Sequence, residues 1–264
     1  MTPLDIDGLR RRFPDRLIEY YPSLDSTMRA AAALELGAVV LAEEQTGGLG
    51  RNGHTWHSEP GSGIYLSMVL AATPVLTLAL GLAAQDAIAK STGIACDLRW
   101  PNDVMIADRK VAGILVQASG AKAIAGIGIN VNHQSFPPEL ADVATSLNRE
   151  RMRLTGGSAC PTLPSDSLQG GTGAFACQHI SREPIVAALL DAADEYLAYD
   201  KPTILRLFTE ASSYAAGRRV EVEEPGGTIR GVTAGLNPDG FLIVRRDDGT
   251  DTLIIAGGVR ATRS

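Results

Sequence analysis

The sequence predicts an α/β domain followed by a small, mostly antiparallel β-barrel. Up to residue 213, apolar runs of strand length alternate with segments of helical periodicity. From Arg218 onward, apolar residues recur at every second position and turn sequences separate the runs. We therefore expect a larger domain over residues 1–213 and a small all-β domain over residues 214–264.

Composition and charge exclude several classes of protein. The chain has 264 residues, 45% hydrophobic and 20% charged, which is ordinary for a globular protein and excludes a disordered chain. Lys and Arg number 24 against 30 Asp and Glu, a formal charge of −6, so no overall positive field attracts nucleic acid. We expect no role in DNA binding.

The cysteines and the N-terminus indicate in which cellular compartment the protein works, and one stretch without charge raises the question of a membrane span. Three cysteines at wide spacing (Cys96, Cys160 and Cys177) form no disulfide framework, and the N-terminus has no apolar core typical of a signal peptide. We expect a cytoplasmic protein. Residues 64–84 carry no charge and could span a bilayer by length. Because Pro74 interrupts them, we predict a buried strand over Ile64–Ala71 and a helix beginning at Pro74 instead.

The other elements of the larger domain follow from capping, turn and periodicity signals. Gly37 ends the first predicted helix, and Pro184 is suited to the first turn of a later one. Arg149–Ser181 is rich in Gly, Ser and Pro and is predicted as a long loop or flexible insertion, given as residues 150–181. The predicted helices are 25–36, 185–199 and 203–211, and the predicted strands are 38–42, 98–100, 104–106, 111–118 and 123–131.

The glycine-rich loop over residues 47–63 contains a G-x-G-x-x-G match at Gly48–Gly53. A dinucleotide fold needs the third glycine to open a helix, and the following His-Thr-Trp-His-Ser-Glu-Pro-Gly does not do so. The loop can still bind an anion, because glycine backbone amides approach closely and Arg51 adds a guanidinium. Trp56 can pack on a ligand. The alternative is an ordinary solvent-exposed loop.

Two further segments suggest an anion site. Lys110 lies in the sequence Ala107-Asp108-Arg109-Lys110, predicted as a hairpin tip, where a fixed positive charge can stabilise an anion. The alternative is a solvated turn, and Asn102 and Asp103 could likewise be mere turn formers. Glycines within the strand Gly126–Asn132 suggest that a ligand or another backbone approaches closely.

Together, these segments resemble the biotin protein ligases. The resemblance runs from Tyr20 to Leu147, resumes in the C-terminal module, and lies in the order and spacing of six motifs. The motifs are Asp25-Ser26-Thr27, Gln45 with Gly48-Leu49-Gly50-Arg51-Asn52-Gly53-His54 and Trp56, Trp100-Pro101-Asn102-Asp103, Arg109–Leu115, Gly126–Asn132 and Ala144-Thr145-Ser146-Leu147. It implies an α+β fold of the class II synthetase and biotin–lipoate ligase type. In that fold, helices flank a mixed β-sheet and a small SH3-like β-barrel follows.

The resemblance implies ATP-dependent activation of biotin to biotinyl-5'-AMP and transfer to a lysine of a biotin carboxyl carrier domain. The implied cofactors are ATP, biotin and Mg²⁺, and the chain would act as a monomer or homodimer with no DNA or membrane partner. A lipoate or octanoate ligase of the same fold and a non-catalytic biotin-binding protein remain alternatives. Some members carry an N-terminal helix-turn-helix, which we do not expect because the motifs begin by Asp25.

The resemblance also implies roles for individual residues. Lys110 and Arg51 would be catalytic, stabilising charge on the α-phosphate. Trp56 would lie by the adenine. The implied biotin-binding residues are Ser26, Thr27, Gln45, Gly50, Arg51, Lys110, Gly113 and Leu115, and the implied ATP-binding residues are Arg51, Trp56, Asn102, Lys110 and Asn130; the metal ligands are not defined.

The sequence departs from the family pattern at several positions. Met28 stands where Asn is common after Ser-Thr, which removes a polar contact to biotin. Leu49, Asn52 and His54 replace basic residues of the usual loop, so we expect weaker retention of the adenylate. Arg99 replaces a common Lys, a change of geometry more than of charge.

Overall fold

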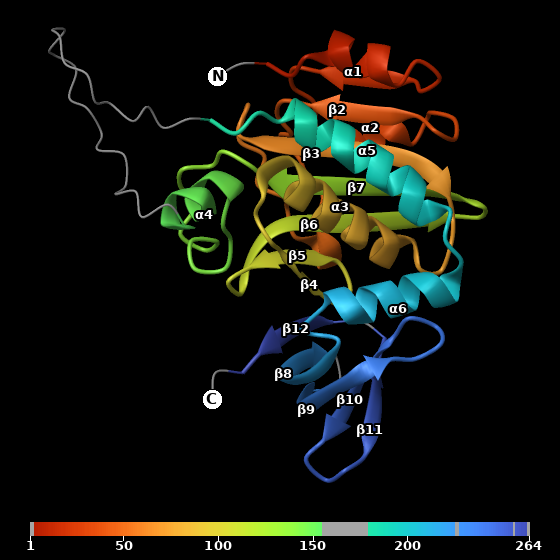
Figure 1. The fold of residues 1–264 in the computed structure, drawn as a ribbon, viewed down its shortest axis with the longest axis vertical. Coiled ribbons are helices and arrows are strands. Elements are labelled where there is room, and N and C mark those ends of the chain that lie inside the picture. Colours follow the sequence, from red (N-terminus) through yellow and green to blue (C-terminus); the bar gives the residue numbers. More distant parts are fainter. Residues whose placement is uncertain (1–2, 155–178, 225–226, 256, 263–264) are drawn as a thin grey trace, which may run out of the picture.

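A computed structural model describes residues 3–154, 179–224, 227–255 and 257–262. It contains a seven-stranded mixed sheet followed by a five-stranded antiparallel sheet, so the predicted α+β class is confirmed (Figure 1). The first sheet has the order β1-β2-β3-β7-β6-β5-β4, in which β1 and β2 run parallel and all other neighbours run antiparallel. Its strands are β1 (Ile18–Tyr21), β2 (Val39–Ala42), β3 (Gly63–Ala71), β4 (Asp97–Arg99), β5 (Asp103–Ile106), β6 (Arg109–Ser119) and β7 (Lys122–Asn130).

The two faces of this sheet differ because the central strands alternate in side-chain size. On β7, Ile127 and Ile129 point to the hydrophobic core, whereas Gly126 and Gly128 point to the opposite face. Helices α3 (Leu76–Thr92) and α5 (Glu183–Leu197) pack together over the core face (Figure 1). The opposite face carries glycine at several central positions and is therefore free to form a binding site.

Further helices contribute side chains to this core. α1 (Ile6–Arg12) begins at Asp5, whose side chain accepts a hydrogen bond from the Gly8 amide. α3 begins at Leu76, two residues after the predicted start at Pro74, and ends at Thr92, where Gly93 follows with φ +71°. α6 (Lys201–Ala211) is capped by Asp200 and lies between the two sheets (Figure 1).

The helix predicted over 25–36 is much shorter in the structure. α2 spans Thr27–Ala31, with Met28 and Ala31 buried. Residues 32–36 are mostly exposed, so no tertiary contact stabilises a longer helix. Gly37, at φ +89°, then turns the chain into β2.

Two further predictions need correction. The hairpin turn consists of Ala107 and Asp108, both at positive φ, so Lys110 lies within β6 and not at a hairpin tip. The beginning of the predicted insertion is helical: α4 spans Leu147–Leu154 because Leu147 and Glu150 are buried by tertiary contacts that composition does not reveal. The predicted flexible insertion otherwise falls largely on residues 155–178, outside the described residues, as do Cys160 and Cys177.

The C-terminal module has the predicted all-β, SH3-like character. Its strand order is β11-β10-β9-β8-β12, with antiparallel pairing throughout. The indole of Trp100 donates a hydrogen bond of 2.9 Å to the Gly240 carbonyl and so ties the module to the first domain. The strands are β8 (Ala216–Glu224), β9 (Gly227–Leu236), β10 (Leu242–Arg246), β11 (Asp251–Ile254) and β12 (Gly258–Ala261).

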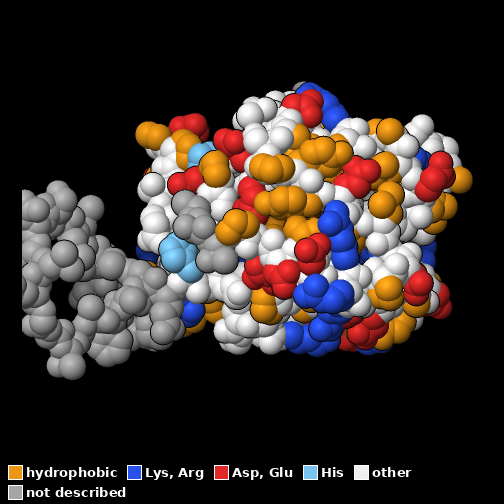
Figure 2. Space-filling view, turned by 90° about the horizontal axis from the view of Figure 1, so that it is seen from above, with side chains coloured by type: hydrophobic (Ala, Val, Ile, Leu, Met, Phe, Trp, Pro, Cys, Tyr) orange, Lys and Arg blue, Asp and Glu red, His pale blue; other side chains and the backbone are white. Residues whose placement is uncertain are grey.

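Among the described residues, no helix is long and apolar enough to cross a bilayer. Acidic and basic side chains are interspersed on the face shown in Figure 2, in keeping with the net charge of −6.

Candidate active site

The glycine-bearing face of the first sheet opens into a cavity of about 1370 Å³. Its walls come from the first sheet, the loop that follows β2, and the C-terminal module. The sequence-predicted residues that line it are Thr27, Gln45, Gly50, Arg51, Trp56, Asn102, Lys110, Gly113, Leu115 and Asn130. The structure therefore brings almost all of the predicted site together.

Ser26 is the exception. It is fully buried, does not line the cavity, and its hydroxyl has no hydrogen-bond partner among the described residues. It lies beside Thr27 at the start of α2. Its predicted contact with biotin therefore remains a prediction.

Glycines form the floor of the cavity because side chains from elsewhere occupy the space above them. A Cβ atom at Gly126 would lie 2.8 Å from the sulfur of Met28, and one at Gly113 would lie 2.7 Å from Cε of Lys110. A Cβ at Gly128 would overlap the indole of Trp56. Any larger residue at these positions would displace the side chains that surround the cavity.

Polar side chains gather at one end of the cavity. The Gln45 amide oxygen accepts hydrogen bonds from the Thr27 backbone amide at 2.9 Å and from the Thr27 hydroxyl at 3.0 Å. The Gln45 amide nitrogen donates to Ser58 at 3.1 Å, and Ser67 donates to Thr27 at 2.8 Å. This network fixes the orientation of the Gln45 amide and the Thr27 hydroxyl toward a ligand with both donors and acceptors.

Positive charges lie at the other end. The Arg51 guanidinium donates a hydrogen bond of 2.9 Å to the Asn102 side-chain oxygen, and a second of 3.4 Å to the Gly257 carbonyl of the C-terminal module. The Lys110 ammonium pairs with the Asp103 carboxylate at 2.5 Å. Arg51 and Lys110 come from different elements but contact adjacent residues, Asn102 in the β4–β5 turn and Asp103 at the start of β5. Both cations therefore line one cavity.

Asp103 balances these charges. Its carboxylate contacts Lys110 through one oxygen and Arg99, at 2.6 Å, through the other. Burial alone would raise the pKa of Asp103, but the two positive charges outweigh burial and hold that pKa below its usual value. This end of the cavity thus contains the three cations Arg51, Arg99 and Lys110 around the one ionised carboxylate of Asp103.

The position of Lys110 is fixed from both sides of its backbone. Its amide donates to the Val143 carbonyl at 2.8 Å, and its carbonyl accepts from the Thr145 amide at 2.9 Å. The motif Ala144–Leu147 therefore acts as a short parallel partner at the edge of β6.

Next to Lys110, Arg109 pairs with the buried Glu150 of α4 at 2.6 Å. Sequence reasoning missed the Arg109–Glu150 pair, since its partners are 41 residues apart.

Trp56 lies between the two ends of the cavity. The Lys110 ammonium is 5.3 Å from its ring centroid, a cation–π contact, and its indole nitrogen is buried without a hydrogen-bond partner among the described residues. The structure thus places Trp56 over the glycine floor beside Lys110. Its predicted position by the adenine remains a prediction.

The two asparagines have different surroundings. Asn102 is buried, and its amide nitrogen donates to the Ile114 carbonyl at 2.9 Å while its oxygen accepts from Arg51. The Asn130 amide nitrogen donates to the Thr145 carbonyl at 3.1 Å. Across the described chain, the Asn130 side-chain oxygen accepts no hydrogen bond, so it is the one available to a ligand.

The rim beside the C-terminal module was not predicted. The Arg218 guanidinium lies 4.2 Å from the Tyr214 ring centroid, and both side chains contact Asp108, at 2.5 Å and 2.7 Å. Burial and the hydrogen bond to Asp108 raise the pKa of Tyr214 to about 12. The only sequence signal was the turn at Asp108, because the partners come from the other domain.

Comparison with known proteins agrees with this geometry. Residues 20–133 match the biotin/lipoate A/B protein ligase family, and residues 216–259 match the biotin protein ligase C-terminal domain. The bifunctional ligase/repressor BirA of Bacillus spizizenii is 31% identical over 262 residues, covering 92% of this chain and 73% of that protein. This chain belongs to the biotin protein ligase family. The family resemblance predicted from the motifs is thus confirmed.

Further relatives support the membership. The biotin–[acetyl-CoA-carboxylase] ligase of Mycobacterium tuberculosis is 30% identical over 248 residues, covering 89% of this chain and 82% of that protein. The structure of the Aquifex aeolicus biotin protein ligase in complex with biotin and ATP superposes with a TM-score of 0.74 at 28% identity, covering 94% of this chain and 99% of that one. Every sequence-predicted site residue lies within the segment matched to the ligase family.

Proposed function

We propose that this chain is an ATP-dependent biotin protein ligase that forms biotinyl-5'-AMP and transfers biotin to a lysine of a carrier domain. One observation carries the proposal: a single cavity has a preorganised amide and hydroxyl at one end and two cations from separate elements at the other. A molecule with a ureido ring at one end and a carboxylate at the other fits this polarity.

The polar end suits the ureido group of biotin. A urea has one carbonyl acceptor and two N–H donors, which match the hydroxyl of Thr27 and the amide of Gln45. The dithiolane ring of lipoate has no such groups, so these polar side chains favour biotin. Met28 gives this end an apolar thioether where the family commonly has an amide.

The cationic end suits the first chemical step. A carboxylate oxygen of biotin attacks the α-phosphorus of ATP, a P–O bond forms, and the bond to pyrophosphate breaks. Negative charge accumulates on the phosphoryl oxygens in the transition state, where Lys110 and Arg51 stabilise it. Lys110 exchanges its contact with the Asp103 carboxylate for one with the phosphate, while Arg99 still pairs with Asp103.

Magnesium fits this site only in part. Among the described residues that line the cavity near Lys110, Asp103 is already neutralised by two cations, and Asn130 offers a free amide oxygen. Mg²⁺ commonly binds through substrate phosphates with few protein ligands, which agrees with this donor set. When bound, it would neutralise part of the triphosphate charge, and Asn130 is the residue positioned to contact it.

The second step needs no covalently modified residue. The carrier lysine amine attacks the acyl carbon of the mixed anhydride, the amide C–N bond forms, AMP leaves, and the amine loses a proton. The chain must therefore hold the adenylate until the carrier arrives. Gly50 and Arg51 lie in the loop that lines the cavity mouth and are suited to that role.

The proposed transfer of biotin to a lysine determines which class of protein accepts it. We propose a biotin carboxyl carrier domain of acetyl-CoA carboxylase or a related carboxylase as acceptor, with the ligase acting in the cytoplasm as a monomer or homodimer. A net charge of −6 gives no general attraction for DNA, so we propose no DNA-binding role.

The test is exchange of labelled pyrophosphate into ATP, with biotin, lipoate or octanoate and saturating Mg²⁺. We expect exchange with biotin alone. Exchange with lipoate or octanoate alone would identify a lipoate-type ligase, and no exchange would overturn the proposed reaction. Transfer to an added biotin carboxyl carrier domain then separates a ligase from a protein that only binds or activates biotin.

A further inference from the structure

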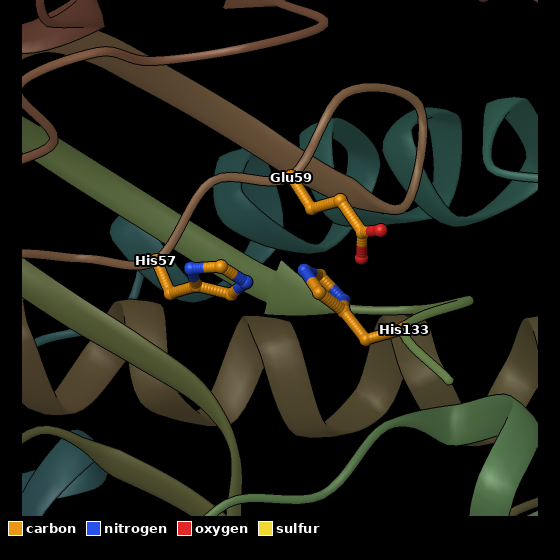
Figure 3. Close-up of side chains that lie close together, drawn as sticks. All are labelled: His57, Glu59 and His133. Carbon is orange, nitrogen blue, oxygen red and sulfur yellow. The ribbon is translucent and has the colours of Figure 1, made fainter. Parts of the chain in front are cut away.

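A second cluster of chemically active side chains lies beside the cavity. His57, Glu59 and His133 point toward one another from two segments: the loop before β3 and the residues after β7 (Figure 3). One ring nitrogen of each histidine and one carboxylate oxygen of Glu59 all lie within 4.8 Å of one another. None of these residues is needed for the proposed activation of biotin.

The protein itself leaves these groups unpaired. His133 is fully buried, and its Nδ1 has no hydrogen-bond partner among the described residues. In the described chain, the Glu59 carboxylate makes no ion pair and accepts no hydrogen bond. A buried polar atom without a partner is costly, which suggests a ligand that satisfies it.

The neighbouring tyrosine sets the tautomer of His133. The Tyr65 hydroxyl donates its one proton to the Glu59 carbonyl at 2.8 Å and also lies 3.3 Å from Nε2 of His133. Nε2 must then be the donor in the second contact, so Nδ1 carries the lone pair. A hydrogen bond on one ring nitrogen that leaves the other free is the usual arrangement of a histidine that binds a metal ion.

An aromatic cluster alone does not account for these residues. Phe136 stacks on His133 with ring centroids 5.2 Å apart, and His57 lies 6.4 Å from the same phenyl ring. These contacts orient both imidazoles but leave the Nδ1 lone pair and the Glu59 carboxylate without a partner.

We propose that His57, Glu59 and His133 bind a divalent transition-metal ion such as Zn²⁺, with Nδ1 of His133 as one ligand. Two imidazoles and one carboxylate are typical of Zn²⁺ and Fe²⁺ sites with open coordination positions, whereas Mg²⁺ and Ca²⁺ prefer oxygen ligands. Metal–ligand bonds of about 2.0–2.2 Å would require the three groups to move slightly closer.

The ion would connect the glycine loop to the sheet. His57 directly follows Trp56, which lies over Gly128 in the cavity, whereas His133 lies just beyond the end of β7. A shared ion would therefore fix the C-terminal end of the loop relative to the strand that forms the cavity floor. This role is distinct from that of Mg²⁺ bound through nucleotide phosphates.

The experiment is calorimetric titration of the full chain, without a histidine tag and after chelator treatment, with Zn²⁺ and separately with Co²⁺. We expect one equivalent to bind in the absence of biotin and ATP, and a Co²⁺ spectrum of nitrogen and oxygen ligation without thiolate charge-transfer bands. We expect His57→Ala and Glu59→Gln each to weaken binding by at least about tenfold. His54→Ala, at an exposed histidine outside the cluster, should retain wild-type affinity.

Thermal unfolding provides a second measurement. Zn²⁺ should raise the melting temperature of the wild type and of His54→Ala, but not that of His57→Ala, since a ligand stabilises only a fold that binds it. The metal-free variants should unfold at similar temperatures, because His57 and Glu59 are only partly buried. Three results would each overturn the proposal. They are a failure to bind the ion saturably, the appearance of thiolate charge-transfer bands with Co²⁺, and wild-type affinity in both His57→Ala and Glu59→Gln. Pyrophosphate exchange is measured separately, so failure of the metal site leaves the proposed ligase activity intact.

Discussion

The ammonium nitrogen of Lys110 lies 2.5 Å from a carboxylate oxygen of Asp103. Arg99 contacts the other oxygen, so one carboxylate holds two cations at the end of the cavity where we place the phosphates. An incoming phosphate would compete with Asp103 for Lys110. The arrangement holds the Lys110 ammonium in position before substrate binds, which is the condition for electrostatic stabilisation of a transition state.

Replacing Lys110 should therefore impair adenylate formation. We expect Lys110→Ala to reduce biotin-dependent pyrophosphate exchange by about 10²–10³-fold, equivalent to about 2.7–4 kcal/mol, the effect of removing one such stabilising group. Lys90→Ala, at an exposed lysine of α3 paired with Asp86, is the matched control. Exchange that survives in Lys110→Ala would contradict its proposed role.

Arg51 should act differently, because it bridges the glycine loop to Asn102 and to Gly257 of the C-terminal module. We expect Arg51→Gly to let biotinyl-5'-AMP escape, which would appear as biotin on lysines of bystander proteins in an immunoblot. Arg206→Gly, at an exposed arginine of α6, should show no such labelling. If Arg51→Gly lost pyrophosphate exchange and bystander labelling to the same extent as Lys110→Ala, then Arg51 would act in forming the adenylate, as Lys110 does, and not in retaining it.

Measuring KM for biotin and KM for ATP separately tests whether the polar end of the cavity binds biotin. Gln45→Leu leaves the Thr27 hydroxyl and amide without their acceptor and removes an amide from the cavity. We expect KM for biotin to rise by roughly 5–150-fold, equivalent to about 1–3 kcal/mol, with little change in KM for ATP. Gln117→Leu, at an exposed position of β6, is the control. An equal rise in both KM values would place Gln45 away from biotin.

The contact between Gly128 and Trp56 can be tested by a double-mutant cycle. A methyl group at residue 128 would lie 2.7 Å from Cζ2 of Trp56, so Gly128→Ala should destabilise the fold by about 1–3 kcal/mol. Combining it with Trp56→Ala should cost less than the sum of the single changes, as urea unfolding would measure. Gly81→Ala, where the nearest atoms are 3.8 Å away, should be neutral or stabilising. If the changes in unfolding free energy of the two single variants simply added up in the double variant, the indole would not lie over Gly128.

Asp103 should make stability depend on acid pH. Its pKa is lower in the folded chain than its usual value of 3.8, so its stabilisation is present above that pH and is lost as the pH falls through the folded value. Asp103→Asn should cost about 1–3 kcal/mol near pH 7, because two cations lose their partner. The difference in unfolding free energy from wild type should shrink as the pH of the urea titrations is lowered below 3.8. A constant difference would show that Asp103 is not ionised in the folded state.

Local signals predicted most of the elements correctly. Period-two patterns and turn sequences predicted the C-terminal sheet. The amphipathic pattern after Pro184 predicted α5, and the helix predicted over 203–211 is α6, both to within a few residues. Where tertiary burial outweighed local propensity, prediction failed: α2 is short because its second half is exposed, and α4 forms because Leu147 and Glu150 are buried.

The order of residues along the chain decides the chemistry of the molecule: which residues carry charge, which are glycines, and in what order the motifs follow. It could not place Lys110 within β6 or pair Asp103 with two cations, because both depend on how β4, β5 and β6 pair. It could not bring His57 and Glu59 to His133, because those segments are far apart in the chain. Only the antiparallel register of β3, β7 and β6 aligns their small residues on one face. That alignment leaves room for a cavity, and a cavity is a property of the packed sheet and not of any segment taken alone.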